Sequence, residues 1–378
     1  MTDRERFRQT MRFGATDRPP LWECAFWGDT YARWSKEGLP EAVMHPEGRP
    51  APTEASLCAY FGFDRSFGIH FRQTLPIHIN LYPPFEREKL AEENGIITER
   101  VGDGSVVRYA PHAHSTRQFV SFPVNSPEDF KAILPRLQSD TPGRFPPGWL
   151  EKAKTRQETG APVCLSVGGY YGFARSLMGL ENLSCSLYDQ PELVEAIFTH
   201  RTEYICRIIE HVLEFVTPDF AEFWEDMAFK TGPLISPVLY RRLALRHYRQ
   251  VTDLLRRHGV DIILLDSDGC VDELIPVWLD GGVTCLWPLE IAAGMDPVAL
   301  RKKYGRSLGL IGGIDKRALA AGREAIRQEV MAKVPFLLGT GGFIPTCDHA
   351  VPPDVSLQDY QYYLSLISEL YGMKGACS

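Results

Sequence analysis

The sequence lacks the features that mark several broad classes of protein. It has no apolar run of about 18 residues, so no membrane-spanning segment is expected. The first residues, MTDRERFRQTMRF, are charged and contain no apolar signal core. Neither GxGxxG nor GxxxxGK[ST] occurs, so the common nucleotide-binding loops are not expected. There is no basic block and the net charge is −7, which argues against a nucleic-acid partner.

The cysteines show no regular spacing of the kind that disulfide-rich or metal-binding domains have. The nine cysteines are scattered, with no CxxC motif. Free thiols without a signal peptide predict a reducing, cytoplasmic location. The rest of the composition is ordinary for a globular protein, with 44% hydrophobic and 24% charged residues among 378. That length suits one large barrel or two ordinary domains.

From about residue 145 onward, strand-like apolar runs alternate with helix-like amphipathic runs. Strands are expected at 161–169, 218–227, 260–269, 283–290, 307–315 and 341–349. This alternation indicates a parallel sheet with helical crossovers. Further strands near residues 21 and 65 bring the number to eight. The sequence therefore predicts an α/β fold in which residues 1–378 form one (β/α)8 TIM barrel domain, with a doubly wound open sheet as the alternative.

The N-terminal part adds two local predictions. Thr2 and Glu5 fit a capping box that opens a first helix. Two β-rich runs flank GDGS at 102–105, which predicts an N-terminal hairpin elaboration. His112 and His114 follow it. On a strand they would share a face and could chelate a metal, or they are structural histidines.

Acidic residues recur where the predicted strands end. The carboxyl ends of barrel strands surround one mouth, and crowded carboxylates there call for a bound cation or raised pKa values. The predicted catalytic residues are Glu225, Asp266, Asp268 and His349. The predicted metal ligands are Asp268, Cys347 and His349, with zinc as the expected ion.

Ordinary structural roles stand beside these predictions. Asp266 or Asp268 could cap the following helix, and Asp315 is expected to cap a helix that begins at Lys316. Glu225–Asp226 and Glu290 could be solvated loop charges. His349 could be a structural histidine.

Residues near the strand ends also predict how an organic substrate binds. The predicted substrate-binding residues are Trp22, Glu23, Tyr170, Tyr171, Arg175, Trp224 and Glu290. A wide mouth is expected to be rimmed by Trp22, Trp27, Tyr170, Tyr171, Phe173 and Trp224. Aromatic walls suit a ligand with an apolar face, although ordinary core aromatics would read the same way.

Several stretches resemble the uroporphyrinogen decarboxylase superfamily, which also contains zinc-dependent methyltransferases that act with corrinoid proteins. They are RPPLW, SVGGYYGFARSLMG, FWEDMAFKTGPLISP, LLDSDGCVDELIPVWLDGG, LIGGIDKRAL and PTCDHAVPPDVS. They lie within residues 1–30 and 160–372, and the resemblance implies the barrel fold.

The chain departs from both branches of that superfamily. The decarboxylases follow the RPPxW-like strand with an arginine-bearing segment for substrate carboxylates. Here Glu23 stands there, and the next arginine is Arg33, so a true uroporphyrinogen decarboxylase is not expected. The methyltransferases carry a His-x-Cys pair after the fifth strand and a further Cys near the end. Here the pair is Asp266-Ser267-Asp268, and Cys347 occupies about the position of the last Cys.

The resemblance implies a metal-dependent methyltransferase that moves a methyl group between a small organic substrate and a corrinoid. The corrinoid would be carried by a separate protein, because the chain has no DxHxxG segment. One alternative is a decarboxylase or other lyase that uses Asp and His as acid and base. A non-enzymatic ligand-binding barrel is the other alternative.

Overall fold

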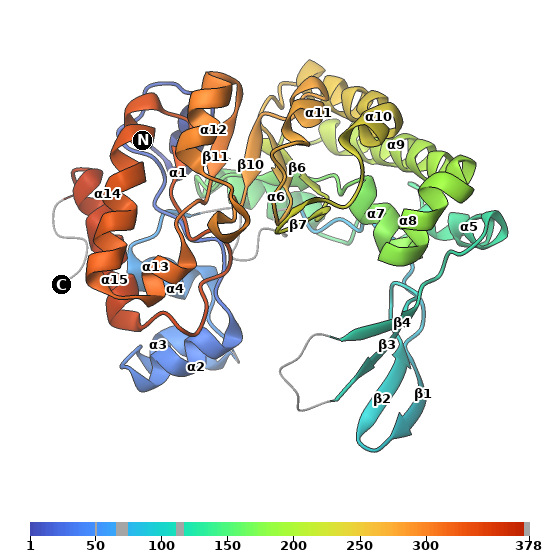
Figure 1. Cartoon of the computed structure of the whole chain (residues 1–378), viewed down its shortest axis with the longest axis horizontal. Helices are drawn as coiled ribbons and strands as arrows, with labels where there is room; N and C mark the ends of the chain where they lie inside the picture. Colours follow the sequence, from blue (N-terminus) through green and yellow to red (C-terminus); the bar gives the residue numbers. More distant parts are fainter. Residues whose placement is uncertain (50, 66–74, 111–116, 374–378) are drawn as a thin grey trace.

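A six-stranded parallel sheet forms the centre of the protein, in the order β12–β11–β10–β9–β6–β5 (Figure 1). The computed structural model describes residues 1–49, 51–65, 75–110 and 117–373. The strands of this sheet are β5 (Cys164–Ser166), β6 (Phe220–Trp224), β9 (Ile263–Asp266), β10 (Cys285–Trp287), β11 (Gly309–Ile311) and β12 (Phe343–Ile344). Each falls inside one of the six ranges predicted from residue 161 onward.

Helices connect the strands, as the alternation predicted. The crossover and closing helices are α9 (Pro191–Leu213), α10 (Pro237–Arg257), α11 (Ile275–Asp280), α12 (Pro297–Tyr304), α13 (Lys316–Ala320), α14 (Arg323–Thr340) and α15 (Leu357–Leu370). Asp315 caps α13 as expected, because its Oδ1 accepts a hydrogen bond from Arg317 N at 2.8 Å. The α/β fold with a parallel sheet is confirmed.

Alternate residues of each strand face opposite layers of the structure. In β9, Ile263 and Leu265 pack in the large cluster beneath the helices, whereas Leu264 belongs to a second, smaller cluster. That smaller cluster lies on the face of the sheet opposite the large cluster, which we call the sheet's interior, and it also includes Phe7 and Met11. Helix α1 (Asp3–Met11) therefore fills the floor beneath the inward-facing side chains. Its predicted capping box, Thr2 with Glu5, is present.

A closed eight-stranded barrel is not completed among the described residues. The segment expected as a strand near residue 21 contributes a single parallel bridge, Phe26 with Val351. Pro19, Pro20 and Pro345 lack amide donors, which limits a hydrogen-bonded ladder between these two segments. The strand expected near residue 65 borders 66–74, which lie outside the described residues.

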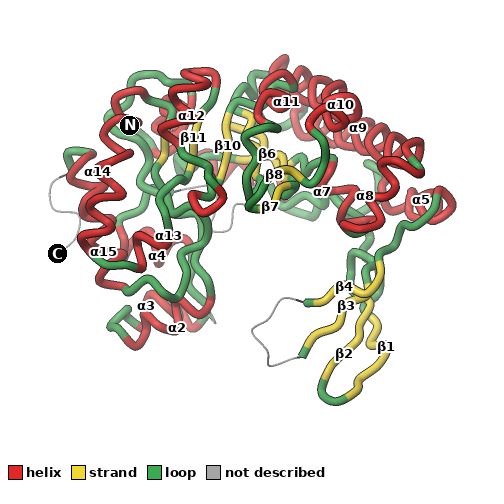
Figure 2. Tube along the Cα trace, in the orientation of Figure 1, coloured by secondary structure: helices red, strands yellow, loops and turns green. Residues whose placement is uncertain are grey.

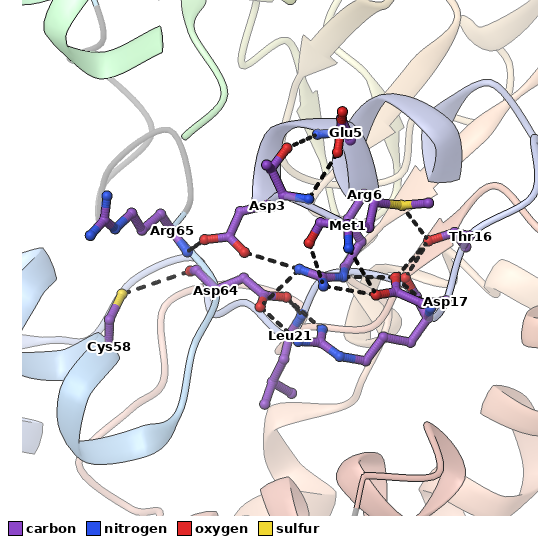
Figure 3. Close-up of polar contacts among 12 residues, drawn as sticks. Met1, Asp3, Glu5, Arg6, Thr16, Asp17, Leu21, Cys58, Asp64 and Arg65 are labelled. Atoms are coloured by element: carbon purple, nitrogen blue, oxygen red, sulfur yellow. Dashed lines mark hydrogen bonds and ion pairs between the residues drawn. The ribbon is translucent and has the colours of Figure 1, made fainter. Parts of the chain in front are cut away.

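Buried ion pairs fasten α1 to the chain that follows it (Figure 3). Arg6 Nη1 lies 3.2 Å from Asp64 Oδ1, and both Arg18 Nη atoms donate to Asp64 at 2.6 and 2.7 Å. Arg6 also binds both carboxylate oxygens of Asp17 at 3.0 Å. Asp64 Oδ2 accepts Leu21 N at 2.8 Å, which ties the floor helix to segment 21–26.

A four-stranded antiparallel sheet projects from the body of the protein (Figure 2). Its strands are β1 (Glu88–Glu93), β2 (Ile96–Arg100), β3 (Val106–Tyr109) and β4 (Gln118–Ser121). The β2–β3 pair spans the segment in which a hairpin was predicted, but it is the middle of a larger sheet. His112 and His114 lie outside the described residues.

The remaining elements were not predicted individually. They are the helices α2 (Gly28–Lys36), α3 (Glu41–Met44), α4 (Glu54–Phe61), α5 (Pro127–Ile133), α6 (Trp149–Glu158), α7 (Tyr171–Met178) and α8 (Leu180–Asp189), the hairpin β7 (Ala228–Phe229) with β8 (Gly232–Pro233), and the 3-10 helices η1 (Pro46–Gly48), η2 (Leu134–Leu137), η3 (Ile291–Ala293) and η4 (Gly305–Ser307). Among the described residues, none of the helices has the length and apolar character needed to cross a bilayer.

Candidate active site

Asp268 and His349 meet at the carboxyl ends of the parallel strands. Asp268 follows β9 and His349 follows β12, and Asp268 Oδ2 lies 3.6 Å from His349 Nε2. The two side chains are 38% and 30% exposed, so a ligand can reach them. The nearby Asp268 carboxylate raises the pKa of His349, against the opposing effect of partial burial. The sequence predicted that these two residues share one point, and the structure brings them together.

Trp27 covers one side of this pair. Its ring is roughly parallel to that of His349, with centroids 6.1 Å apart and an interplanar angle of 23°. The indole is 52% exposed. Trp27 directly precedes α2, so the first segment of the chain supplies an aromatic wall beside the last strand. Of the six aromatic residues predicted at the rim, this one lies over the acid–base pair.

A chain of contacts holds the loops that carry the pair. Glu290 Oε2 accepts Gly269 N at 2.9 Å, and Glu290 Oε1 accepts Lys316 Nζ at 3.1 Å. Lys316 Nζ lies 3.7 Å from Oδ1 of Asp348, the residue before His349. Asp348 is buried and accepts the backbone N–H groups of Lys316 and Ile291 at 3.1 and 3.0 Å. These contacts close a ring, Asp268–Gly269–Glu290–Lys316–Asp348–His349, that fixes the pair.

Asp266 and Asp268 take different places although only one residue separates them. Asp266 is the last residue of β9 and is 5% exposed. Its charge raises the pKa of Cys24, a thiol in the sheet's interior, after the larger effects of burial and Glu23. Asp266 is therefore buried at the end of β9, whereas Asp268 lies in the loop beyond the strand and is 38% exposed beside His349.

Glu225 is buried and surrounded by donors. Its carboxylate accepts Tyr170 N and Gly172 N, each at 2.9 Å, Tyr240 Oη at 3.1 Å, and Tyr248 Oη. Burial raises the pKa of Glu225, while these hydrogen bonds act in the opposite direction. The carboxylate therefore positions the first turn of α7, away from solvent. A Cβ at Gly172 would lie 2.7 Å from Glu225 O, so glycine permits this close packing.

Arg175 and Trp224, both predicted to bind substrate, are neighbours. The Arg175 guanidinium lies 5.6 Å from the Trp224 ring centroid and forms an ion pair with Asp226. Tyr170 is buried instead, and its hydroxyl donates to His247 O at 3.0 Å. Tyr171 is also buried, within the large cluster. The structure therefore places Arg175 and Trp224 near the strand ends, and the two tyrosines in the core.

Three other predicted residues lie away from the pair. Trp22 is buried on the floor and stacks on Phe7, with ring centroids 5.2 Å apart. Glu23 faces α15, where its carboxylate accepts Tyr360 Oη and Cys347 N, both at 3.1 Å. Burial raises the pKa of Glu23 to about 8. Cys347 is fully buried in the large cluster beneath the helices.

The predicted zinc ligands are not assembled. Structural and catalytic zinc sites use at least three protein ligands. Asp268 and His349 lie close together, but the side chain of Cys347 points away from them, into the large cluster beneath the helices. Across residues 1–49, 51–65, 75–110 and 117–373, no group of three or more His, Cys, Asp or Glu side chains is placed to hold a metal. Among the described residues, the predicted donors Asp268, Cys347 and His349 therefore do not form a zinc site.

A cavity of about 530 Å³ opens beside β5 and β6. It is bounded by the ends of these strands, by segment 75–81 and by Gly102–Asp103 in the β2–β3 turn. Trp224, in its wall, is paired in the sheet with Asp266, two residues before Asp268. The cavity and the acid–base pair thus lie at the same end of neighbouring strands.

Some residues at this end were not predicted as site residues. Lys316 and Asp348 complete the ring of contacts, and Ser166 and Glu222 line the cavity. The period-2 alternation of β5 and β6 would have indicated Ser166 and Glu222, because they share a face with Cys164 and Phe220. Lys316 begins a helix, and nothing in the local sequence distinguishes it from an ordinary surface lysine.

Comparisons with known proteins agree on the family and the fold. A family model described as "Uroporphyrinogen decarboxylase (URO-D)" matches residues 103–370. A uroporphyrinogen decarboxylase from Alcanivorax borkumensis is 26% identical over 226 residues, covering 56% of this chain and 58% of that protein. The chain therefore matches little more than half the length of this relative. A methyltransferase from Methanosarcina mazei aligns with a TM-score of 0.61 at 14% identity, covering 98% of this chain and 99% of that chain. This last likeness shows a shared fold.

Proposed function

The chain belongs to the uroporphyrinogen decarboxylase family, and from that premise we propose that it is an enzyme that moves a methyl group to or from a heteroatom of a small organic molecule. The observation that carries the proposal is the Asp268–His349 pair at the open end of the sheet. The full-length likeness to a protein named as a methyltransferase supports this choice within the family.

Methyl transfer at a heteroatom requires a proton to move. When a thiol or hydroxyl accepts a methyl group, its proton must leave, and when a methyl ether or thioether loses the group, the heteroatom must gain a proton. Neutral His349 takes the proton in the first direction, and protonated His349 supplies it in the second. Asp268 stabilises the protonated imidazole in both directions of the reaction. This role agrees with its effect on His349, whose pKa it raises.

We propose a corrinoid on a separate protein as the other methyl carrier. Two elements extend on either side of the strand ends, α2–α3 and sheet β1–β4, on the same side of the molecule as β7 (Figure 1). Methylcobalamin serves as a free substitute for such a carrier. Its methyl group passes to a thiol, the Co–C electron pair stays with cobalt, which becomes Co(I), and the thiol proton passes to His349.

The test follows the visible spectrum of methylcobalamin mixed with the protein and a panel of small thiols and phenols. The expected result is enzyme-dependent loss of the methylcobalamin spectrum with formation of the methylated acceptor. His349→Ala should lower this rate by about 10²-fold or more, as for loss of a general acid or base. Formation of no methylated product with any acceptor would contradict the proposal.

The same assay in a strong chelator tests the zinc prediction. Because the donor set does not fit zinc, the rate should be unchanged by chelation. Loss of the rate on chelation, with recovery on adding one equivalent of Zn²⁺, would show that a metal takes part.

Decarboxylation of a small organic acid is the second candidate. It is favoured by the printed name of the family model and of the curated relative, both uroporphyrinogen decarboxylase. His349 would then protonate the carbon left after loss of CO2. Release of CO2 from small acids, abolished in His349→Ala and with methylcobalamin untouched, would select this reaction over methyl transfer.

A further inference from the structure

The cavity beside β5 and β6 has a wall that is mostly apolar. Its volume, about 530 Å³, falls within the range of roughly 300–1,000 Å³ typical of sites for small organic molecules. Ile77, Ile79 and Leu81 come from one segment, and Leu165 and Leu177 come from β5 and α7. Such a wall favours a ligand that buries apolar surface.

The segment that forms one side of the cavity is held by buried arginines. Arg201 Nη1 donates to Ile79 O at 2.5 Å, and Arg144 donates to the carbonyls of His78, Asn80 and Tyr82. Both guanidinium groups are buried. Backbone fixed in this way gives the cavity a wall of defined shape, which favours a specific ligand.

The lining disfavours an organic anion. Among the described residues that line it there is no lysine or arginine, whereas Glu222 and Asp103 contribute carboxylates. His78 also lines the cavity. The pKa of its ring is lowered, mainly by burial and to a smaller extent by the nearby charge of Arg144, so the ring is neutral near pH 7. An anionic ligand would lose hydration without meeting a cation in this lining.

The lining also disfavours a cation. The two aromatic walls, Phe173 and Trp224, each carry a guanidinium group already. Arg201 lies 4.4 Å from the Phe173 centroid and Arg175 lies 5.6 Å from the Trp224 centroid. An aromatic ring attracts a cation through its negative face, and a guanidinium nearby opposes a second cation.

We propose that this cavity binds an uncharged small organic molecule with an apolar ring, whose oxygen or nitrogen atoms hydrogen-bond to Ser166 and Asn80. Calling this molecule the methyl-transfer substrate rests on the proposed function, whereas its binding does not. Because Trp224 pairs with Asp266, a ligand in the cavity lies on the strand next to the one that leads to Asp268.

Three probes of nearly equal size test the proposal by calorimetric titration of the full chain. They are 4-methoxybenzyl alcohol, which is neutral, 4-methoxybenzoate, which is an anion, and 4-methoxybenzylamine, which is a cation. The neutral probe should bind, and both charged probes should bind about tenfold more weakly or worse. The anion would meet no cation in the described lining, and the cation would face aromatic rings that already carry guanidinium groups. Equal or tighter binding of either charged probe, or no binding of the neutral one, would overturn the proposal.

A matched pair of variants locates the site. Leu81 is a partly buried residue of the wall, and Leu90 is an exposed residue of β1 outside it. Leu81→Lys should weaken the alcohol and strengthen the benzoate about tenfold or more, because the new ammonium can reach the cavity. Leu90→Lys should change neither. Identical titrations for both variants would place the ligand elsewhere.

The titration also separates this proposal from the proposed function. It contains no methyl carrier, so its outcome does not depend on the methyl-transfer reaction. Retained binding together with failure of methyl transfer to any acceptor would contradict the proposed function and leave the cavity assignment standing. Methyl transfer without binding of the neutral probe would contradict the cavity assignment alone.

Discussion

His349 Nε2 lies 3.6 Å from Asp268 Oδ2, although 80 residues separate them in the chain (positions 269–348). The contact joins the end of β12, the last strand of the parallel sheet, to the loop after β9, and two strands, β11 and β10, lie between them in the sheet order. Lys316, Glu290 and Asp348 hold the two loops in place around it. A histidine paired in this way can exchange protons with a ligand at the open end of the sheet.

The pH dependence of methyl transfer should follow His349. Asp268 raises the pKa of His349, so in Asp268→Asn that pKa falls toward or below the ordinary value. With a thiol acceptor, neutral His349 is the active form, and the rate rises with pH through the pKa of His349. The rising limb of log kcat against pH should therefore move to lower pH in Asp268→Asn. The ionisation of the thiol itself is the same for both proteins and does not contribute to the difference.

The reverse direction provides the internal control for that profile. Demethylation of an ether by cob(I)alamin needs protonated His349, so its rate should fall with pH through the same pKa. If the rate changed with pH in the same sense in both directions, His349 would not be the group that titrates. The same conclusion would follow if the pH profile of Asp268→Asn coincided with that of the unmodified chain.

Glu225→Gln should destabilise the fold. The carboxylate accepts hydrogen bonds from two backbone N–H groups and two tyrosine hydroxyls in a fully buried place. An amide has one oxygen, and its NH2 group would face donors, so we expect a loss of about 2–4 kcal/mol in the free energy of unfolding in urea. Glu181→Gln, at an exposed position of α8, is the control and should change little.

The opposite result for Glu225 would also be informative. Unchanged stability with abolished turnover would mean that Glu225 acts on the substrate, as the sequence predicted.

Much of this architecture could be predicted from the sequence because it depends on local patterns. Six strand ranges and the helices between them follow from apolar runs of strand and helix period, and Asp315 capped its helix as expected. The proximity of Asp268 and His349 followed from a single rule, that parallel strands end on the same side. The face of the sheet on which each side chain lies was harder to predict, because an error of one residue in the strand register places that side chain on the opposite face. Glu23 and Cys347 face α15 and the helices for this reason, and Trp22 faces the floor.

The ring of contacts could not be predicted from local patterns. Lys316, Glu290 and Asp348 meet only because three loops, after β10, β11 and β12, pack together. Barrel closure is a similar case, since it depends on pairing between segment 21–26 and the far end of the chain, and only the bridge Phe26–Val351 forms there.

Asp64→Asn should loosen the floor of the sheet. Asp64 is 8% exposed and faces Arg6 and Arg18 together, so the substitution leaves two guanidinium groups without their shared carboxylate (Figure 3). We expect the free energy of unfolding to fall by about 3 kcal/mol, as when one partner of a buried ion pair is removed. Asp253→Asn, at an exposed position of α10, is the control. A change in Asp64→Asn as small as in the control would mean that the ion pairs do not hold α1 in place.

The most direct test of the central claim compares methyl transfer from methylcobalamin by four proteins: the unmodified chain, His349→Ala, Asp268→Asn and His45→Ala. His45 is a partly exposed histidine near α3, outside the ring of contacts, and serves as the control. We predict that kcat falls by about 10²-fold or more in His349→Ala, falls less in Asp268→Asn, and is unchanged in His45→Ala, with thermal midpoints near that of the unmodified chain. Full activity in a correctly folded His349→Ala protein would contradict the account.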